Sequence, residues 1–219
     1  MPVTNCTQKS FQFPVCNRRS VETNFQGGDI TSDGGVLLLQ QVDRRLGLSE
    51  AVAHALDDPR RQASCDHDGL SLLRQRVYAL ALGYEDLNDH ETLRQDLAIQ
   101  TALGRTEELA SSSTLCRWEN RIKEQQLDLF ADRTSCHRWW PNQFRLLLSS
   151  LGYMLLEAIR RLALKGTELA NAYVGTLRLK LLKIGAVILR NTRRVRILLA
   201  SAYPHQRLFL QVAARLAPD

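Results

Sequence analysis

The sequence predicts an α+β protein that is mostly helical, with an N-terminal helical region and a short basic β-segment near the C-terminus. Three observations support this fold class. Apolar residues recur at helical spacing through most of residues 36–165. A weak two-residue alternation is confined to residues 1–25. Alternation of apolar with basic side chains is confined to residues 176–201, which indicates strands there.

The first elements are short strands followed by a turn. "FQFPV" and "SVETNF" alternate as strands do, and "GGDITSDGG" follows them. The glycines of this stretch suit a turn, and we expect Ser32 or Asp33 to cap the helix that comes next. Because the stretch lacks the spacing of a nucleotide-phosphate loop, we interpret it as a turn and a cap, not as a phosphate cradle.

Residues 36–96 then carry a helical pattern with clear end signals. "VLLLQQVDRRLGL" ends in Gly47, and "SEAVAHALDD" starts at a Ser cap. "DGLSLLRQRVYALALGY" starts at Asp68 and ends near Gly83. These segments predict compact packed helices.

Two further helices and the basic β-segment are expected after the Ser-rich "ASSSTL". "CRWENRIKEQQLDLF" is amphipathic, and a long apolar helix starts at Pro141 and ends near Gly166. "TLRLKLLKIGAVILRNTRRVRILLAS" predicts two or three strands with turns near Gly185 and "NTRR", before a short helix at Pro204. A sheet with one apolar and one basic face could track a phosphate backbone, or it could be a half-buried sheet with a solvated outer face.

Composition excludes several classes of protein. The longest apolar runs fall short of the ~20 residues that a membrane-spanning helix needs, so we expect no membrane partner. The N-terminus lacks the charged and apolar regions of a secretory signal, which predicts a cytoplasmic protein. Five widely spaced cysteines without a C-x-x-C pair indicate neither a disulfide framework nor a zinc finger.

Charge divides the chain near residue 118. Residues 1–118 carry a net charge of −4 and residues 119–219 a net charge of +10. We therefore predict two regions, 1–118 with short strands then helices, and 119–219 with helices, basic strands and a terminal helix. The second region would face a polyanion, although a solvated surface rich in arginine would carry the same charge.

Long stretches of the chain resemble bacterial insertion-sequence transposases of the DDE class. "FQGGDITSDGGVLLLQQVDRRLGLSEAVAHALDDPR" and "LLRQRVYALALGYEDLNDHETLRQD" are similar to the N-terminal region of the IS-thirteen-eighty group, which is related to the IS-four transposases. "ENRIKEQQLDLFADRTSCHRWWPNQFRLLLSSLGYMLLEAIRRLALKGTELA" resembles the C-terminal region of the same group. The resemblance implies a remnant of a ribonuclease-H-like catalytic core.

The resemblance also implies a catalytic role for one residue. In the intact family three carboxylates together hold two Mg²⁺ ions, and Glu119 in "ENRIKE" matches the third of these acids. The two catalytic aspartates have no counterpart, and Ser112 and Leu115 replace the Tyr and Arg that precede the family's glutamate. We therefore expect an inactive chain that holds no metal cofactor. Its N-terminal and C-terminal regions would be joined at "WENR", where the catalytic middle of the family is deleted.

DNA, at the ends of an insertion sequence, is the expected partner. A homo-oligomer or co-assembly with an intact transposase is a second expectation. The expected phosphate contacts are the basic residues after the join, namely Arg121, Lys123, Arg133, Arg138, Lys180, Lys183, Arg190, Arg193, Arg194 and Arg196.

Two other hypotheses stay open at this point. The chain could be an active Mg²⁺-dependent transposase that cuts and joins DNA, alone or by donating Glu119 to another copy. It could equally be a pseudogene product without function, because a deleted core sheet leaves apolar faces and sheet edges uncovered.

Overall fold

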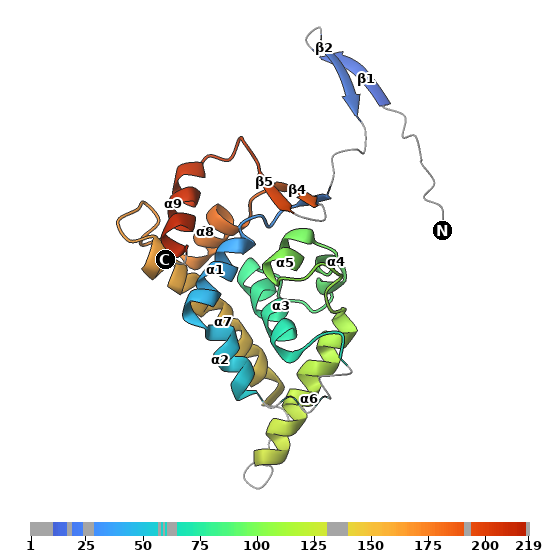
Figure 1. Ribbon diagram of the computed structural model, residues 1–219, viewed down its shortest axis with the longest axis vertical. Coiled ribbons are helices and arrows are strands. Elements are labelled where there is room, and N and C mark those ends of the chain that lie inside the picture. The colour runs from blue at the N-terminus through green and yellow to red at the C-terminus, as the bar shows by residue number, and fades with distance from the viewer. Residues whose placement is uncertain are drawn as a thin grey trace.

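The computed structural model describes residues 11–16, 19–23, 29–56, 58, 60, 65–130, 140–190 and 194–217 (Figure 1). In this part of the chain the fold is mostly helical with two small antiparallel sheets, as the sequence predicts. The strands are β1 (Phe11–Cys16), β2 (Arg19–Thr23), β3 (Asp29–Thr31), β4 (Ala186–Arg190) and β5 (Val195–Leu199). The helices are α1 (Val36–Leu46), α2 (Leu48–Ala55), α3 (Gly69–Leu82), α4 (His90–Leu93), α5 (Leu97–Ala102), α6 (Ser112–Phe130), α7 (Trp140–Ala163), α8 (Val174–Leu177), the π-helical turn η2 (Arg178–Leu182) and α9 (Gln206–Leu216).

Several predicted boundaries are confirmed. Gly47 and Gly83 end α1 and α3 with positive φ angles of 62° and 98°. Asp68 caps α3 by accepting a 2.7 Å hydrogen bond from the backbone N–H of Ser71. Ser111 caps α6 through its hydroxyl, which accepts a hydrogen bond from the backbone N–H of Thr114.

The expected cap of α1 was wrong. Gly35 occupies the N-cap position without a side-chain hydrogen bond. The carboxylate of Asp33 is buried and is used by other partners: it accepts a 2.8 Å hydrogen bond from Tyr84 and forms a 2.8 Å ion pair with Lys183. The side chain thus links the segment just before α1 to Tyr84 and Lys183, which lie far away in the sequence.

One of the two sheets is local in sequence, and the other brings distant segments together. β1 and β2 form a hairpin, with Phe11 opposite Thr23, that Figure 1 shows apart from the helices. The other sheet has the order β3-β4-β5, so β3 from the first region pairs with β4 from the second, and β4 also pairs with β5. Its register sets Ile30 opposite Val187, and Val187 opposite Leu198.

One hydrophobic core contains residues from both predicted regions. α3 packs against α7, and α1 packs against α5, α7 and α9 (Figure 1). Leu39 and Leu82 from the first region share this core with Leu155, Leu182 and Val212 from the second. The boundary predicted at residue 118 remains a prediction about sequence regions, because both regions bury their apolar faces together.

The start of α1 touches residues 181–184 closely enough to require glycine. The backbone N–H of Gly34 donates to the carbonyl of Ile184 at 2.9 Å, and that of Gly35 donates to the carbonyl of Leu182 at 3.1 Å. A Cβ added to Gly35 would lie 1.9 Å from the carbonyl oxygen of Leu181. This contact joins two segments far apart in sequence.

The first strand predicted in "TLRLKLLKIGAV" was wrong. Residues 174–182 form α8 and η2, because Leu177, Leu181 and Leu182 bury one helical face. The Nε–H of Arg178 also donates to the carbonyl of Ala81 at 2.8 Å, so this arginine is bound to the end of α3. The two later strands, on either side of "NTRR", are confirmed as β4 and β5.

The outer face of the β3-β4-β5 sheet is mainly apolar instead of basic. Ile30, Leu189 and Leu198 are 73%, 47% and 51% exposed, and the pairing places them on one face with Arg196. The expectation of one apolar and one basic face was therefore wrong for this sheet. The apolar character of the long helix α7 suggests a buried helix, but Leu146 and other apolar residues on one side of it are exposed. No described helix is long and apolar enough to cross a membrane.

Candidate functional site

The predicted catalytic acid lies in a buried ion pair. Glu119 is on the second turn of α6, and its Oε1 lies 2.9 Å from Nε of Arg76 on α3. The side chain of Glu119 is 1% exposed and that of Arg76 is 3% exposed. The neighbouring Trp118 is buried as well. Glu119 therefore lies among the packed helices, away from bulk solvent.

Arg76 connects this carboxylate to the surrounding chain. Its Nη2 donates to the carbonyl of Glu85 at 2.9 Å, and its Nη1 lies 3.4 Å from Nε2 of His90. Burial, reinforced by the charge of Arg76, lowers the pKa of His90 from 6.5 to about 4. His90 is thus neutral near pH 7, and the buried charges are those of one guanidinium and one carboxylate.

Gln75 closes this buried network. Its Nε2 donates to the carbonyl of Ala110 at 2.8 Å and lies 3.2 Å from Nδ1 of His90. Its Oε1 accepts a 3.1 Å hydrogen bond from the backbone N–H of Ala110. The network therefore fixes the chain just before α6 against α3, and Glu119 belongs to this internal connection.

The surroundings of Glu119 do not fit a Mg²⁺ ion. Magnesium favours several oxygen ligands, commonly carboxylates and water, in octahedral geometry. Here the carboxylate lies 2.9 Å from the guanidinium of Arg76, which would repel a cation. Within the residues that the structure describes, no three His, Cys, Asp or Glu side chains gather in a way that could hold a metal ion.

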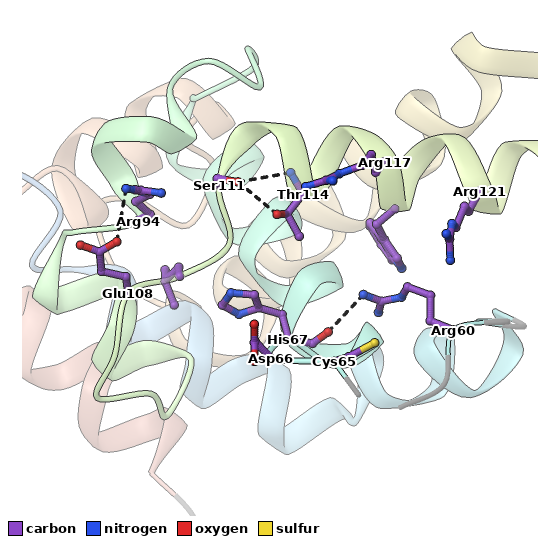
Figure 2. Close-up of a pocket in the computed structure, with 12 residues that line it drawn as sticks. Arg60, Cys65, Asp66, His67, Arg94, Glu108, Ser111, Thr114, Arg117 and Arg121 are labelled. Atoms are coloured by element: carbon purple, nitrogen blue, oxygen red, sulfur yellow. Dashed lines mark hydrogen bonds and ion pairs between the residues drawn. The ribbon is translucent and has the colours of Figure 1, made fainter. Parts of the chain in front are cut away.

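A polar pocket lies along the other side of the same helix. The cavity has a volume of about 550 Å³ and lies between the start of α6 and a wall formed by Arg60 and residues 65–67 (Figure 2). Figure 2 shows Arg117 and Arg121 along α6, with Arg60 on the opposite wall. The lining residues are Arg60, Cys65, Asp66, His67, Arg94, Glu108, Leu109, Ser111, Thr114, Arg117, Trp118 and Arg121.

Two of the four arginines in this pocket are neutralised by acids. Arg60 pairs with Asp58 at 2.5 Å, and Arg94 pairs with Glu108 at 3.3 Å. Arg117 and Arg121 are exposed, and neither has an ion pair to any residue whose side chain is described. The pocket therefore carries two arginines without an acid partner among the described side chains, one helical turn apart, together with the exposed carboxylate of Asp66.

His67 adds no positive charge to the pocket at neutral pH. Burial lowers its pKa below the usual 6.5, and the charge of nearby Arg105 lowers it further. The imidazole can still donate or accept a hydrogen bond. The positive charge of the site thus comes from guanidinium groups.

The predicted phosphate contacts whose side chains are described have different surroundings. Arg121 lies in the pocket, but Lys183 pairs with Asp33, and its ammonium lies 3.8 Å from the ring centre of Tyr84. Arg190 donates to Oε1 of Gln100 at 3.4 Å and to the carbonyl of Thr106.

Of the remaining predicted contacts, Arg194 and Arg196 are exposed and Lys180 is half-buried. The side chain of Lys123 and the whole of Arg133, Arg138 and Arg193 lie outside the described residues. The DNA-binding role of all these residues stays a prediction.

Sequence reasoning missed Arg60 and Arg117 as members of a site. Arg117 precedes Arg121 by four residues in a predicted helix, so a search for basic residues on one helical face would have found this pair. No comparable signal exists for Arg60, because it lies 57 residues before Arg117 and meets α6 only in the fold.

Comparison with known protein families gives one match. A family model described as transposase DDE domain group 1 matches the chain in two segments, residues 13–121 and 118–219. The segments share only "WENR", residues 118–121, which include Glu119 and two residues of the pocket. No curated protein and no solved structure gives a significant match.

Proposed function

Because this chain belongs to the family of transposase DDE domains of group 1, we propose that it is a DNA-binding remnant of a transposase that no longer cuts DNA. In finer terms, it derives from the IS-thirteen-eighty group and has lost the catalytic middle of a ribonuclease-H-like core. Its DNA would be the ends of an insertion sequence, met in the cytoplasm.

The single observation that carries this proposal is the pairing of Glu119 with Arg76. A DDE acid must share metal ions with two other carboxylates, whereas this one is buried against a guanidinium 2.9 Å away. Releasing it would leave Arg76 buried without its counter-ion, at a cost of about 3 to 5 kcal/mol. Glu119 therefore serves the packing of α6 on α3 and is unsuited to catalysis.

The two-part family match supports an internal deletion. Two segments that meet and overlap at residues 118–121 indicate a discontinuity between the chain and the family model. The four shared residues, "WENR", fit both segments, as expected if recombination between two similar short sequences removed the part between them. The change in net charge falls at the same position.

The shared core supports a folded remnant over a non-functional pseudogene product. Apolar residues of α1 and α3 pack with those of α7 and α9, and β3 pairs with β4. A chain whose two parts had no stable packing would lack such a common core.

Exposed apolar surface supports an assembly with other chains. Ile30, Leu189 and Leu198 form an apolar face on the sheet, a feature that commonly marks a site of association. We infer that the remnant forms a homo-oligomer or joins an intact transposase and inhibits it.

Two assays on one purified sample test the proposal. Binding to duplex DNA with the terminal repeats of the element should weaken steeply as salt rises, because phosphate contacts release counter-ions. Strand cleavage and joining should be absent with Mg²⁺ or Mn²⁺. If the purified chain cleaves DNA and Glu119→Gln abolishes the cleavage, the chain is the alternative, an active DDE transposase. If the purified chain binds no DNA, the proposed DNA-binding remnant is contradicted.

A further inference from the structure

We infer that the pocket between α6 and the wall formed by Arg60 and residues 65–67 binds backbone phosphate of duplex DNA, with Arg117 and Arg121 as the main charged contacts. This inference rests on the proposed DNA-binding function and assigns it to a particular surface. The pocket lies mainly in the N-terminal region, whereas the charge pattern of the sequence indicated the C-terminal region.

An excess of hydrogen-bond donors over free acceptors indicates an anionic ligand. Arg117 and Arg121 have no acid partner among the described side chains, whereas Nε of Arg94 lies 3.8 Å from the carboxylate of Glu91. Of the two acids that line the pocket, Glu108 is paired with Arg94, which leaves the exposed carboxylate of Asp66 against the two guanidinium groups of Arg117 and Arg121. An added anion would satisfy these donors, whereas a cation would meet several guanidinium groups.

Trp118 supplies an independent observation at the same place. This residue lines the pocket, is 2% exposed, and its indole N–H has no acceptor among the described residues. A buried N–H without an acceptor costs about 1 to 3 kcal/mol, so an acceptor brought by a ligand would remove that cost. Phosphate oxygens are such acceptors, because they carry negative charge and no proton at neutral pH.

The first turn of α6 favours the same ligand. Ser111 and Thr114 at the start of this 19-residue helix line the pocket, so the positive end of the helix dipole lies beside it. Arg117 and Arg121 continue along the same helix, and Figure 2 shows Arg121 pointing from α6 toward the opposite wall while Arg117 lies along the helix. Fork-shaped guanidinium groups suit phosphate oxygens, which accept two parallel hydrogen bonds.

Extended DNA suits the site better than a small free anion. The cavity opens onto the exposed face of α6, where Arg117 and Arg121 are spaced one helical turn apart. Two such charges can contact one phosphate together with its neighbour along a strand, and a free phosphate ion offers no such neighbour.

The test measures binding of the full chain to a short fluorescent DNA duplex over a range of salt concentrations. The test variant is Arg117→Gln with Arg121→Gln. The matched control is Arg44→Gln with Arg207→Gln, which removes the same charge from exposed positions outside the pocket. We expect the pocket variant to bind at least about tenfold more weakly, with a salt slope lower by about 2, and the control to bind nearly as the wild type does.

A second variant separates the hydrogen bond from charge. Trp118→Phe keeps a ring against Phe144, whose ring centre lies 5.9 Å from that of Trp118, but removes the indole N–H. It should weaken DNA binding several-fold without changing the net charge. Thermal unfolding of each variant confirms that it is folded.

The outcomes distinguish this inference from the proposed function. If the wild type binds DNA and the pocket variant binds equally well, the pocket assignment fails and DNA binding stands. If the wild type binds no DNA, both fail. If inorganic phosphate binding needs Arg117 and Arg121 while DNA binding does not, the site is a small-anion site and the assignment to DNA is overturned.

Discussion

Nε of Arg76 lies 2.9 Å from Oε1 of Glu119, and this pair joins α3 to α6 where both side chains are buried. Removing one partner of a buried pair leaves the other charge without compensation. The pair therefore gives Glu119 a role that can be measured independently of any enzymatic activity.

The first prediction concerns this carboxylate. Glu119→Gln should lower the free energy of unfolding by about 3 kcal/mol, because the buried charge of Arg76 loses its counter-ion. Urea unfolding measures the loss. Arg76→Met combined with Glu119→Leu should recover part of it, since neither buried charge remains. Unchanged stability of Glu119→Gln would contradict a structural role.

The second prediction concerns pH and His90. The folded-state pKa of about 4 lies below the ordinary 6.5, so the unfolded chain binds the proton more readily. The contribution of neutral His90 is therefore complete above about pH 6.5 and is lost as the pH falls toward 4, up to about 3 kcal/mol. Unfolding measured across this range should show that loss, and His90→Gln should flatten the curve. If His90→Gln keeps the wild-type pH dependence of stability, other titrating groups cause that dependence.

The helices of the first region could be predicted because their signals are local. Gly47, Asp68 and Gly83 end or cap helices through contacts within a few residues. Residues 178–182 alternate leucine with basic side chains and so resemble a strand in sequence, but burial of Leu181 and Leu182 together selects a helix. Local pattern could not decide between these structures.

The site could be predicted only in part because its contacts are long-range. The family resemblance identifies Glu119, but its partner Arg76 lies 43 residues earlier, and no spacing rule connects them. Lys183 looked like a phosphate contact in an alternating basic segment, whereas the fold brings it to Asp33. The sequence therefore shows that a residue is basic, but it does not show which group that residue pairs with in the fold.

The third prediction tests the junction between the two regions at Gly35. Gly35→Ala should destabilise the fold by several kcal/mol, because its Cβ would lie 1.9 Å from the backbone oxygen of Leu181. The control is Gly175→Ala, where nothing lies within 4 Å of the added Cβ. Denaturant unfolding compares the two. Equal stability of both variants would show that the start of α1 does not pack on residues 181–184 as described.

The fourth prediction separates structural from DNA-binding basic residues. Lys183→Gln should lower the unfolding free energy by about 2 kcal/mol, because buried Asp33 loses its ion pair and Tyr84 loses a cation over its ring. Its affinity for DNA, measured at a temperature where it is folded, should stay close to that of the wild type. Arg121→Gln should have the opposite profile, with normal stability and weaker DNA binding. A strong loss of DNA binding in Lys183→Gln would show that Lys183 contacts DNA, against this prediction.

The fifth prediction concerns the apolar outer face of the β3-β4-β5 sheet. Leu198 is 51% exposed and stands in register with Val187 and Ile30, so these side chains form a continuous strip on the sheet surface. β5 is also an edge strand, whose free backbone groups can pair with another chain. We expect the wild type to self-associate as its concentration rises, measured by sedimentation equilibrium, and Leu198→Lys to shift the equilibrium toward monomer. Leu46→Lys is the matched control, because Leu46 is similarly exposed, at 48%, but lies at the end of α1. Association that Leu46→Lys weakens as much as Leu198→Lys would indicate a general effect of charge, and the sheet face would then have no special role in assembly.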